Sequence, residues 1–184
     1  RFGLYNMLLE AHKQVAKESN RKLIFIPVSI AHEYVPEQKS LARELGGGAK
    51  KKESAFQILG LVKMFAYQFG SIHIKLGNPV EVDAEELMSE TLDFKKYTQD
   101  VAFKCFREVG RNMMVTPTSL LALVLLDEPS GAMLWQDIIR KARAISEYCK
   151  KFDIPCSESL DGELEPCMER AMDILIGNKR IDVI

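Results

Sequence analysis

The run Leu23–Ile30 constrains the fold of this chain more than any other stretch. Almost every residue in it is apolar, which is typical of a strand that helices cover on both faces of a parallel sheet. Pro27 interrupts the run and cannot donate a hydrogen bond to a neighbouring strand, so we expect an irregularity there. A buried strand at this place means that the first half of the chain contains a sheet.

A second strand is predicted at 71–76, where apolar and polar residues alternate strictly. Its apolar face, which we expect to be the buried one, consists of Ile72, Ile74 and Leu76. Between the two strands the sequence predicts a short helix over 36–45 and a longer helix that begins at Ser54. Strand, helix and strand within about sixty residues are the minimum for a parallel crossover, so residues 1–82 are predicted to be α/β.

The second half of the chain has a different texture, because its apolar residues recur only at helical spacing. Thr116 followed by Pro117 is a typical helix start, and the turn Asp127–Gly131 ends that helix. Residues 93–184 are therefore predicted to be a helical C-terminal domain. The boundary with the α/β part, residues 1–82, is expected between 83 and 93.

Charge is distributed unevenly along the 184 residues, whose net charge is −1. Residues 1–82 contain twelve basic and seven acidic side chains, whereas residues 83–184 contain thirteen basic and nineteen acidic ones. A basic first half suits a small anionic substrate. The helices between Thr116 and Phe152 allow a DNA-binding regulator as an alternative, but their acidic surroundings argue against nucleic acid as a partner.

The residue types present predict neither a metal site nor a membrane-spanning segment. The four cysteines form no Cys-x-x-Cys pair and no histidine follows His73, which argues against zinc and for a reducing compartment. The longest apolar run, Leu120–Leu126, is far shorter than the ~20 residues of a membrane span. Because the chain opens at Arg1 inside an amphipathic helix and stops at the strand-like Ile181–Ile184, we expect a piece of a longer protein.

Two clusters of residues are candidates for chemistry. The lysines of Lys50–Lys52 follow three glycines, Gly46–Gly48, and precede a predicted helix, an arrangement that can hold a phosphate; the alternative is a solvated charged loop. His32 and Glu33 follow the first strand, where ligands bind in open α/β sheets. His32 could act as an acid or base, or it could be a loop histidine that only shapes the site. The metal-binding pattern His-Glu-x-x-His is not present, because position 36 is proline.

Several motifs resemble those of the glycerol-3-phosphate acyltransferases and their dihydroxyacetone-phosphate relatives. They are Ile26–Ile30, Glu33–Val35, Ala42–Gly47, Lys50–Ser54, Phe69–Ile74 and Gly77–Pro79. The Lys-x-Lys-Glu-Ser element at 50–54 is the most specific of them. The resemblance is close over residues 1–82 and loose beyond, where the family also has a helical region.

The resemblance implies a partial acyltransferase sheet with a strand–helix–strand crossover, followed by an all-helical C-terminal region. It implies an enzyme of phospholipid biosynthesis that transfers an acyl group to glycerol 3-phosphate. The acyl donor is acyl-CoA or acyl carrier protein, as a co-substrate rather than a bound cofactor. Dihydroxyacetone phosphate and lysophosphatidate stay open as acceptors. The full-length protein is expected at the cytoplasmic face of a membrane, as a peripheral protein, and the present piece to be soluble.

The family's catalytic block His-x-x-x-x-Asp is absent from this sequence. Five residues after His12, His32 and His73 stand Lys17, Glu37 and Asn78. The catalytic residues are therefore expected upstream of Arg1, and this piece alone is expected to be inactive. The substrate-binding residues that the resemblance implies are Pro27, Ser29, Lys50, Lys52, Glu53 and Ser54. The rival interpretation is a non-catalytic helical module that binds a partner or a lipid.

Overall fold

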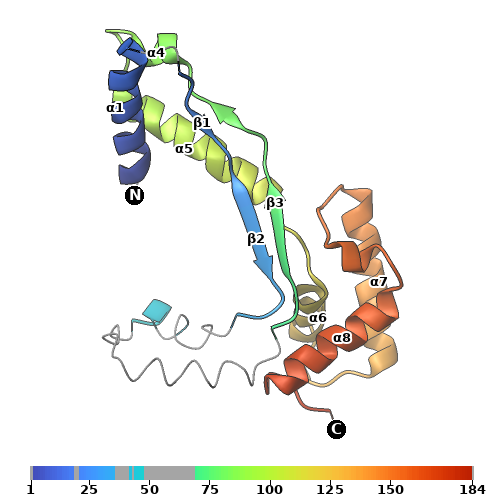
Figure 1. Cartoon of the computed structure of the whole chain (residues 1–184). Helices are drawn as coiled ribbons and strands as arrows, with labels where there is room; N and C mark the ends of the chain where they lie inside the picture. Colours follow the sequence, from blue (N-terminus) through green and yellow to red (C-terminus); the bar gives the residue numbers. More distant parts are fainter. Residues whose placement is uncertain (1, 19–20, 36–41, 43, 48–68, 184) are drawn as a thin grey trace. The chain divides into compact units, whose positions relative to one another are not determined.

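The computed structural model describes residues 2–18, 21–35, 42, 44–47 and 69–183 (Figure 1). The predicted helices over 36–45 and after Ser54 lie largely outside these residues. The chain divides into two compact units, each built from two segments. Unit 1 comprises 1–30 and 74–113, and unit 2 comprises 31–73 and 114–184. The division into an α/β domain, 1–82, and a helical domain, 93–184, stays a prediction.

The strands form a two-stranded ribbon. Strand β1, Ile24–Phe25, pairs antiparallel with β4, Val80–Glu81, and β2, Val28–His32, pairs with β3, Ile72–Leu76. Hydrogen bonds join Gly77 N to the Pro27 carbonyl at 2.8 Å and Glu33 N to the Ser71 carbonyl at 3.1 Å.

These two bonds show that β2 and β3 are antiparallel, because the partner moves from 77 back to 71 as the chain advances from 27 to 33. The prediction of a parallel crossover between these strands is wrong. Strand–helix–strand order permits either orientation, since a connection this long can return the chain to either end of its partner strand.

The irregularity expected at Pro27 is confirmed. Ile26 and Pro27 separate β1 from β2, so the apolar run forms two short strands instead of one. Ile24 lies opposite Glu81, whereas Pro27 is bonded to Gly77, so the register shifts by one residue between the two pairs. The additional residue in the partner segment makes a bulge there, which is a place where a sheet tolerates proline.

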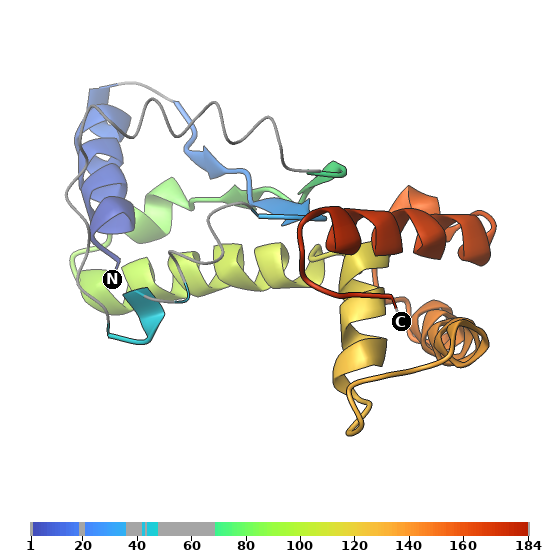
Figure 2. The same ribbon diagram turned by 90° about the horizontal axis from the view of Figure 1, so that it is seen from below.

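Three helices accompany the ribbon in unit 1: α1, Gly3–Glu18; α4, Ala84–Met88; and α5, Phe94–Arg111. Asp83 and Asp93 cap α4 and α5 by accepting backbone N–H bonds, which satisfies donors that a helix start leaves unpaired. Figure 2 shows α1 lying across one end of the long α5. The buried core of the unit consists of Leu9, Val82, Leu87, Tyr97 and Val101.

Unit 2 is a packed set of helices: α6, Pro117–Leu126; α7, Trp135–Lys151; the 3₁₀ turn η1, Glu158–Leu160; and α8, Leu164–Gly177. Helix α6 packs against both α7 and α8. Apart from a bridge between Val115 and Cys156, the regular structure described after residue 93 is helical, as predicted. The buried core consists of Leu120, Leu121, Val124, Ile138, Ile139, Ala142, Leu160, Cys167, Met168 and Ala171.

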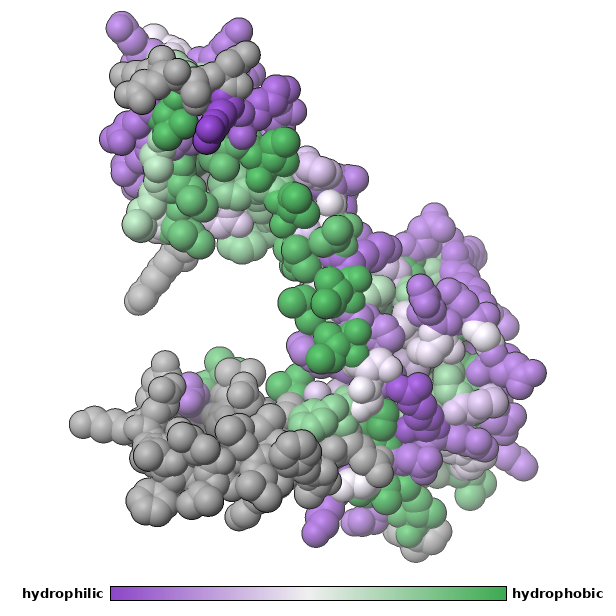
Figure 3. Space-filling view, viewed as in Figure 1, coloured by the Kyte–Doolittle hydropathy of each residue, from purple (hydrophilic) through white to green (hydrophobic). Residues whose placement is uncertain are grey.

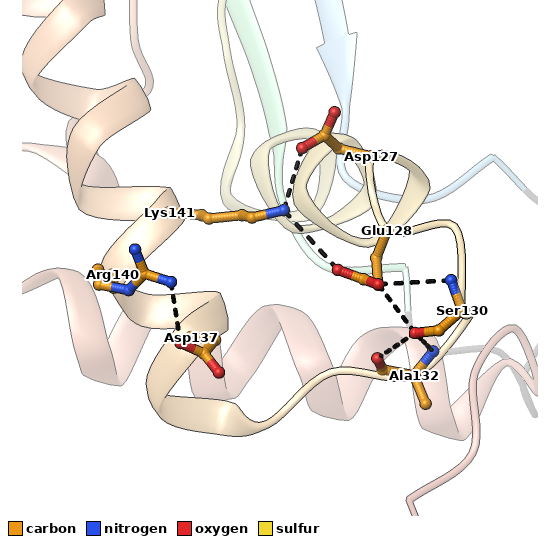
Figure 4. A network of polar contacts seen from close by, with 7 residues as sticks. All are labelled: Asp127, Glu128, Ser130, Ala132, Asp137, Arg140 and Lys141. Atoms are coloured by element: carbon orange, nitrogen blue, oxygen red, sulfur yellow. Dashed lines mark hydrogen bonds and ion pairs between the residues drawn. The ribbon is translucent and has the colours of Figure 1, made fainter.

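Both ends of α6 follow the sequence prediction. Thr116 forms a capping box with Ser119, and Pro117 occupies the first turn. The turn after α6 is held by a small polar network, shown in Figure 4. Lys141 Nζ lies 3.0 Å from Asp127 Oδ2 and 3.9 Å from a Glu128 carboxylate oxygen, so α7 is tied to the end of α6.

Burial along the ribbon differs from the prediction. In Ile24–Ile30 the even positions are exposed and the odd positions are buried or half-buried, so one face alone is covered. In β3 the supposed buried face is also wrong, because Ile72, Ile74 and Leu76 are 59–65% exposed. The period of two was predicted correctly. Which face is covered depends on where the helices pack, and the alternation does not contain that information.

Candidate functional site

Two of the predicted substrate-binding residues, Pro27 and Ser29, lie on the covered face of the ribbon. Pro27 is buried, and its carbonyl oxygen accepts the Gly77 N–H. Ser29 is 2% exposed. Both are thus held firmly in place by the packing of unit 1. Their role in a substrate pocket stays a prediction.

The other predicted substrate-binding residues are Lys50, Lys52, Glu53 and Ser54. All four lie outside the residues that the structure describes. The hypothesis that the lysines hold a phosphate therefore stands on the sequence alone.

The best-built polar cluster of unit 2 surrounds the carboxylate of Glu33, directly after β2. The Glu33 side chain is 3% exposed, and its Oε2 accepts the Ser71 N–H at 2.6 Å. Arg170 Nη2, from α8, lies 3.4 Å from the same oxygen and donates to Ser71 Oγ at 2.7 Å. A buried carboxylate needs such hydrogen-bond donors, because burying an unpaired charge costs free energy. The cluster joins the end of β2, the start of β3 and α8.

Gly70 is required by this cluster. Its φ of +65° lies in the left-handed region that favours glycine. A Cβ atom there would collide with the Glu33 carboxylate and approach Ile174 Cδ1 to 2.8 Å. The space beside Gly70 is therefore what lets the carboxylate reach the Ser71 N–H.

A second polar contact of unit 2 joins Tyr34 to Arg180, which follows α8. Arg180 Nη2 donates to the Tyr34 hydroxyl at 3.2 Å, and the guanidinium carbon lies 5.5 Å from the centre of the ring. The latter distance is within the range of a cation–π interaction. Arg180 Nε is buried and has no hydrogen-bond partner in the described residues. The segment after α8 is thus fastened to the residue that follows Glu33.

All three histidines of the chain lie in the described residues. The Nε2 atoms of His12 and His73 are buried and have no hydrogen-bond partner there. His32 is exposed at the end of β2. A histidine that acts as a general base is normally oriented by a carboxylate. The described groups of the Glu33 cluster can hold backbone and side chains in position. They include no activated nucleophile.

The four cysteines are free thiols. Burial raises the pKa of Cys167, and the nearby Glu33 charge raises it further. Burial, with Cys149 adjacent, raises the pKa of Cys156 to about 11. Neutral thiols are poor nucleophiles, so the environments of these two cysteines do not favour covalent catalysis.

Other kinds of site are scarce in the described residues. They contain no group of three or more His, Cys, Asp or Glu side chains that could hold a metal ion. None of their helices is long and apolar enough to span a bilayer. A shallow depression of about 540 Å³ lies at the start of α8, lined by Arg143, Glu163, Leu164, Glu165, Pro166 and Glu169. It contains no predicted site residue.

Sequence reasoning missed Arg170 and Arg180. Arg170 lies 137 residues from Glu33, and Arg180 lies 146 residues from Tyr34. On its helix Arg170 is an ordinary exposed position, so no local pattern marks it. The available signal was the placement of Glu33 and Tyr34 directly after a strand, which indicates that partners are needed without naming them.

The comparison with protein families decides what this arrangement belongs to. The sequence model described as "Glycerol-3-phosphate acyltransferase C-terminal region" matches residues 41–183. The chain belongs to this family. The match contains Ser71, Arg170 and Arg180, so the polar clusters of unit 2 lie largely within the family region.

Individual relatives agree with the family assignment. A glycerol-3-phosphate acyltransferase of Pseudomonas aeruginosa (strain PAO1) is 34% identical over 192 residues, which is 94% of this chain and 23% of the relative. Its counterpart in Pseudomonas paraeruginosa (strain PA7) is 27% identical with the same coverage. That of Pseudomonas fluorescens (strain SBW25) is 28% identical over 149 residues, 73% of this chain and 18% of the relative.

The chain spans less than a quarter of the length of these curated relatives. No solved structure matches it. The family model reaches through the helices of unit 2, whereas the resemblance in motifs is close only over residues 1–82.

Proposed function

We propose that this chain is the C-terminal portion of a glycerol-3-phosphate O-acyltransferase of phospholipid biosynthesis. The observation that carries the proposal is the match of the family's C-terminal region over residues 41–183, which includes both the Lys50–Ser54 element and α8. The acyl donor is acyl-CoA or acyl carrier protein, and it is consumed as a co-substrate. The parent protein works at the surface of a membrane, because the product carries an acyl chain.

The proposed reaction forms an ester and releases a thiol. The acceptor hydroxyl loses its proton to a general base, its oxygen attacks the thioester carbonyl, and the carbon–sulfur bond breaks. The proton ends on the departing thiolate. The base and its aspartate belong to the His-x-x-x-x-Asp block, which this sequence lacks. The chain alone is therefore inactive in this proposal.

The contribution of this chain is to hold substrate and scaffold. Pro27, between β1 and β2, and Ser29, in β2, both lie on the covered face of the ribbon, so they can present fixed backbone groups to a neighbouring substrate. Lys50 and Lys52 supply positive charge for the phosphate of glycerol 3-phosphate or of the acyl donor. Within unit 2, the Glu33 cluster holds the end of β2 and the start of β3 to α8.

The test is an acyl-transfer assay on two proteins, the parent reading frame and the 184-residue chain. Radiolabelled glycerol 3-phosphate is incubated with palmitoyl-CoA or palmitoyl acyl carrier protein, and labelled lipid is extracted. We expect labelled lipid from the parent protein and none from the 184-residue chain. Dihydroxyacetone phosphate is offered in parallel as acceptor. A parent that is folded and transfers acyl groups to neither acceptor contradicts the proposal.

A double substitution in the parent tests the lysines. Lys50→Ala with Lys52→Ala removes two positive charges and is expected to raise KM for one phosphorylated substrate by about tenfold or more, in line with one or two lost charge-assisted hydrogen bonds. Lys150→Ala with Lys151→Ala, at the exposed end of α7, is the matched control. Unchanged KM values for both substrates would contradict the proposal that the lysines contact a phosphate. They would not contradict the proposed acyl-transfer reaction.

A further inference from the structure

The ribbon of unit 1 exposes a row of aliphatic side chains on one side. We call this side the ribbon face; it consists of Ile24, Ile26, Val28, Ile30, Ile74 and Leu76. Each of these side chains is between 40% and 65% exposed. In Figure 3 the strongly hydrophobic colour continues along the ribbon where these strands run. Contiguous apolar surface of this kind marks an interaction site in a soluble protein.

The register shows that these side chains share one face. The bonds between Pro27 and Gly77 and between Glu33 and Ser71 place Ile30 opposite Ile74 and Val28 opposite Leu76. Residues directly opposite in an antiparallel pair project to the same side. Ile24 and Ile26 continue the exposed set, because the exposed positions from 24 to 30 are all even.

The covered side of the ribbon holds the other residues of the same run. Phe25 packs against Tyr5 of α1 with ring centres 5.3 Å apart, and its neighbours along that side are Pro27 and Ser29. The run is thus largely apolar on both faces, as strands between two layers are. In the described residues of unit 1 one layer is present. In the same described residues the ribbon face has no second layer against it.

We infer that the ribbon face docks against the part of the parent acyltransferase that lies outside this chain. The inference rests on the proposed function, in which this chain is one portion of a longer enzyme. The curated relatives are more than four times as long as the stretch they share with this chain, and the matching family region is the C-terminal one. In the proposed function, the partner is thus another part of the same polypeptide.

Polypeptide suits the ribbon face better than lipid does. Each sheet in the described residues has two strands only, so its outer edges carry unpaired backbone N–H and C=O groups beside the apolar side chains. Another segment of protein can satisfy these groups, whereas lipid tails cannot. The charge beside the strands is also mixed and not uniformly basic, since Lys22 is paired with Glu81 at 2.6 Å.

Cysteine labelling tests the inference. Ile74→Cys, in a Cys156→Ser background, places a thiol at the centre of the ribbon face, and Ile30→Cys places a second one opposite it. Leu126→Cys, at the 84% exposed end of α6, is the matched control. Maleimide reaction rates are measured in the 184-residue chain and in the parent protein. The buried native thiols Cys149 and Cys167 report that each variant is folded, since they stay unreacted.

We expect Ile74→Cys and Ile30→Cys to react about as fast as Leu126→Cys in the chain alone, and at least tenfold more slowly than Leu126→Cys in the parent. Equal rates in the parent overturn the inference. Protection in the chain alone at low concentration also overturns it, because the chain then covers the face itself. Protection that rises with chain concentration and accompanies dimers in sedimentation overturns it too, and assigns the face to a second copy.

A membrane arm completes the experiment. The parent is labelled with and without vesicles of phosphatidylethanolamine and phosphatidylglycerol. Protection that needs vesicles assigns the face to lipid and overturns the inference. The acyl-transfer assay is read separately on the same preparations. Slow labelling in a parent without acyltransferase activity refutes the proposed function and leaves the docking of the two portions standing, whereas fast labelling in an active parent refutes the docking alone.

Discussion

The helical bundle of unit 2 and the ribbon of unit 1 satisfy their apolar residues in different ways. In the bundle, α6, α7 and α8 turn their apolar positions toward one another, and Leu121, Val124 and Met168 are fully buried. In the ribbon, apolar residues stand on both faces and only one face is covered. A helix with one apolar stripe can be completed by its neighbours, whereas a strand with two apolar faces needs a layer on each side.

The largest expected effect comes from removing a core side chain in one region and an exposed one in the other. Leu121→Ala should lower the free energy of unfolding of the chain by about 2–5 kcal/mol, because it leaves a cavity in the bundle. Leu76→Ala on the ribbon face should change it by no more than about 0.5 kcal/mol. Denaturant titration followed by circular dichroism measures both. Equal losses would mean that the ribbon face is already covered within this chain.

The next effect concerns two glycines with similar backbone angles and different surroundings. Gly70 and Gly131 have φ of +65° and +71°, but only at Gly70 would an added methyl group meet other atoms within 4 Å. Gly131→Ala should cost about 1–2 kcal/mol from backbone strain alone. Gly70→Ala should cost about 1–3 kcal/mol more, because the methyl group displaces the Glu33 carboxylate. The denaturation midpoints of the two variants are compared. Similar losses of stability would show that the atoms around Gly70 move to make room for the methyl group.

A smaller effect separates the partners of the Glu33 cluster. Glu33→Gln should destabilise the chain by about 1–3 kcal/mol, since it replaces a buried acceptor of two hydrogen bonds. Arg170→Gln should cost about 1 kcal/mol or less, because the Arg170 side chain is 57% exposed and water can replace part of its contact. Thermal unfolding of the two variants and their double variant checks the order. A larger loss of stability for Arg170→Gln would mean that Arg170, and not the Glu33 carboxylate, contributes most to the cluster.

The smallest effect is a pH dependence at Cys156. Its pKa is raised to about 11 from an ordinary value of 9.0, first by burial and then by Cys149. Between these values the unfolded chain has released a proton that the native chain retains, so native stability falls as pH rises through this range. Stability is compared at about pH 8 and about pH 10.5, and iodoacetamide rates at Cys156 are followed alongside. Cys156→Ser should show a weaker alkaline loss; an identical loss would assign it to other groups.

Several parts of the fold follow from residues close together in the sequence. Thr116 and Pro117 start α6, and the turn after Leu126 ends it, both as predicted. The irregularity at Pro27 was also predicted, because the missing N–H of proline acts on its immediate neighbours. These features depend on backbone chemistry within a few residues, which is why they were accessible from the sequence.

Local spacing was enough to predict the strand segments around 23–30 and 71–76 and the helices after residue 93, and motifs such as Lys50–Ser54 were enough to predict the family. Tertiary structure alone decided that β2 and β3 run antiparallel, that Ile74 and Leu76 face outward, and that Arg170 meets Glu33. The physical reason is distance along the chain. Orientation, choice of covered face and long-range ion pairs depend on how remote segments pack, and no single segment encodes the position of its partner.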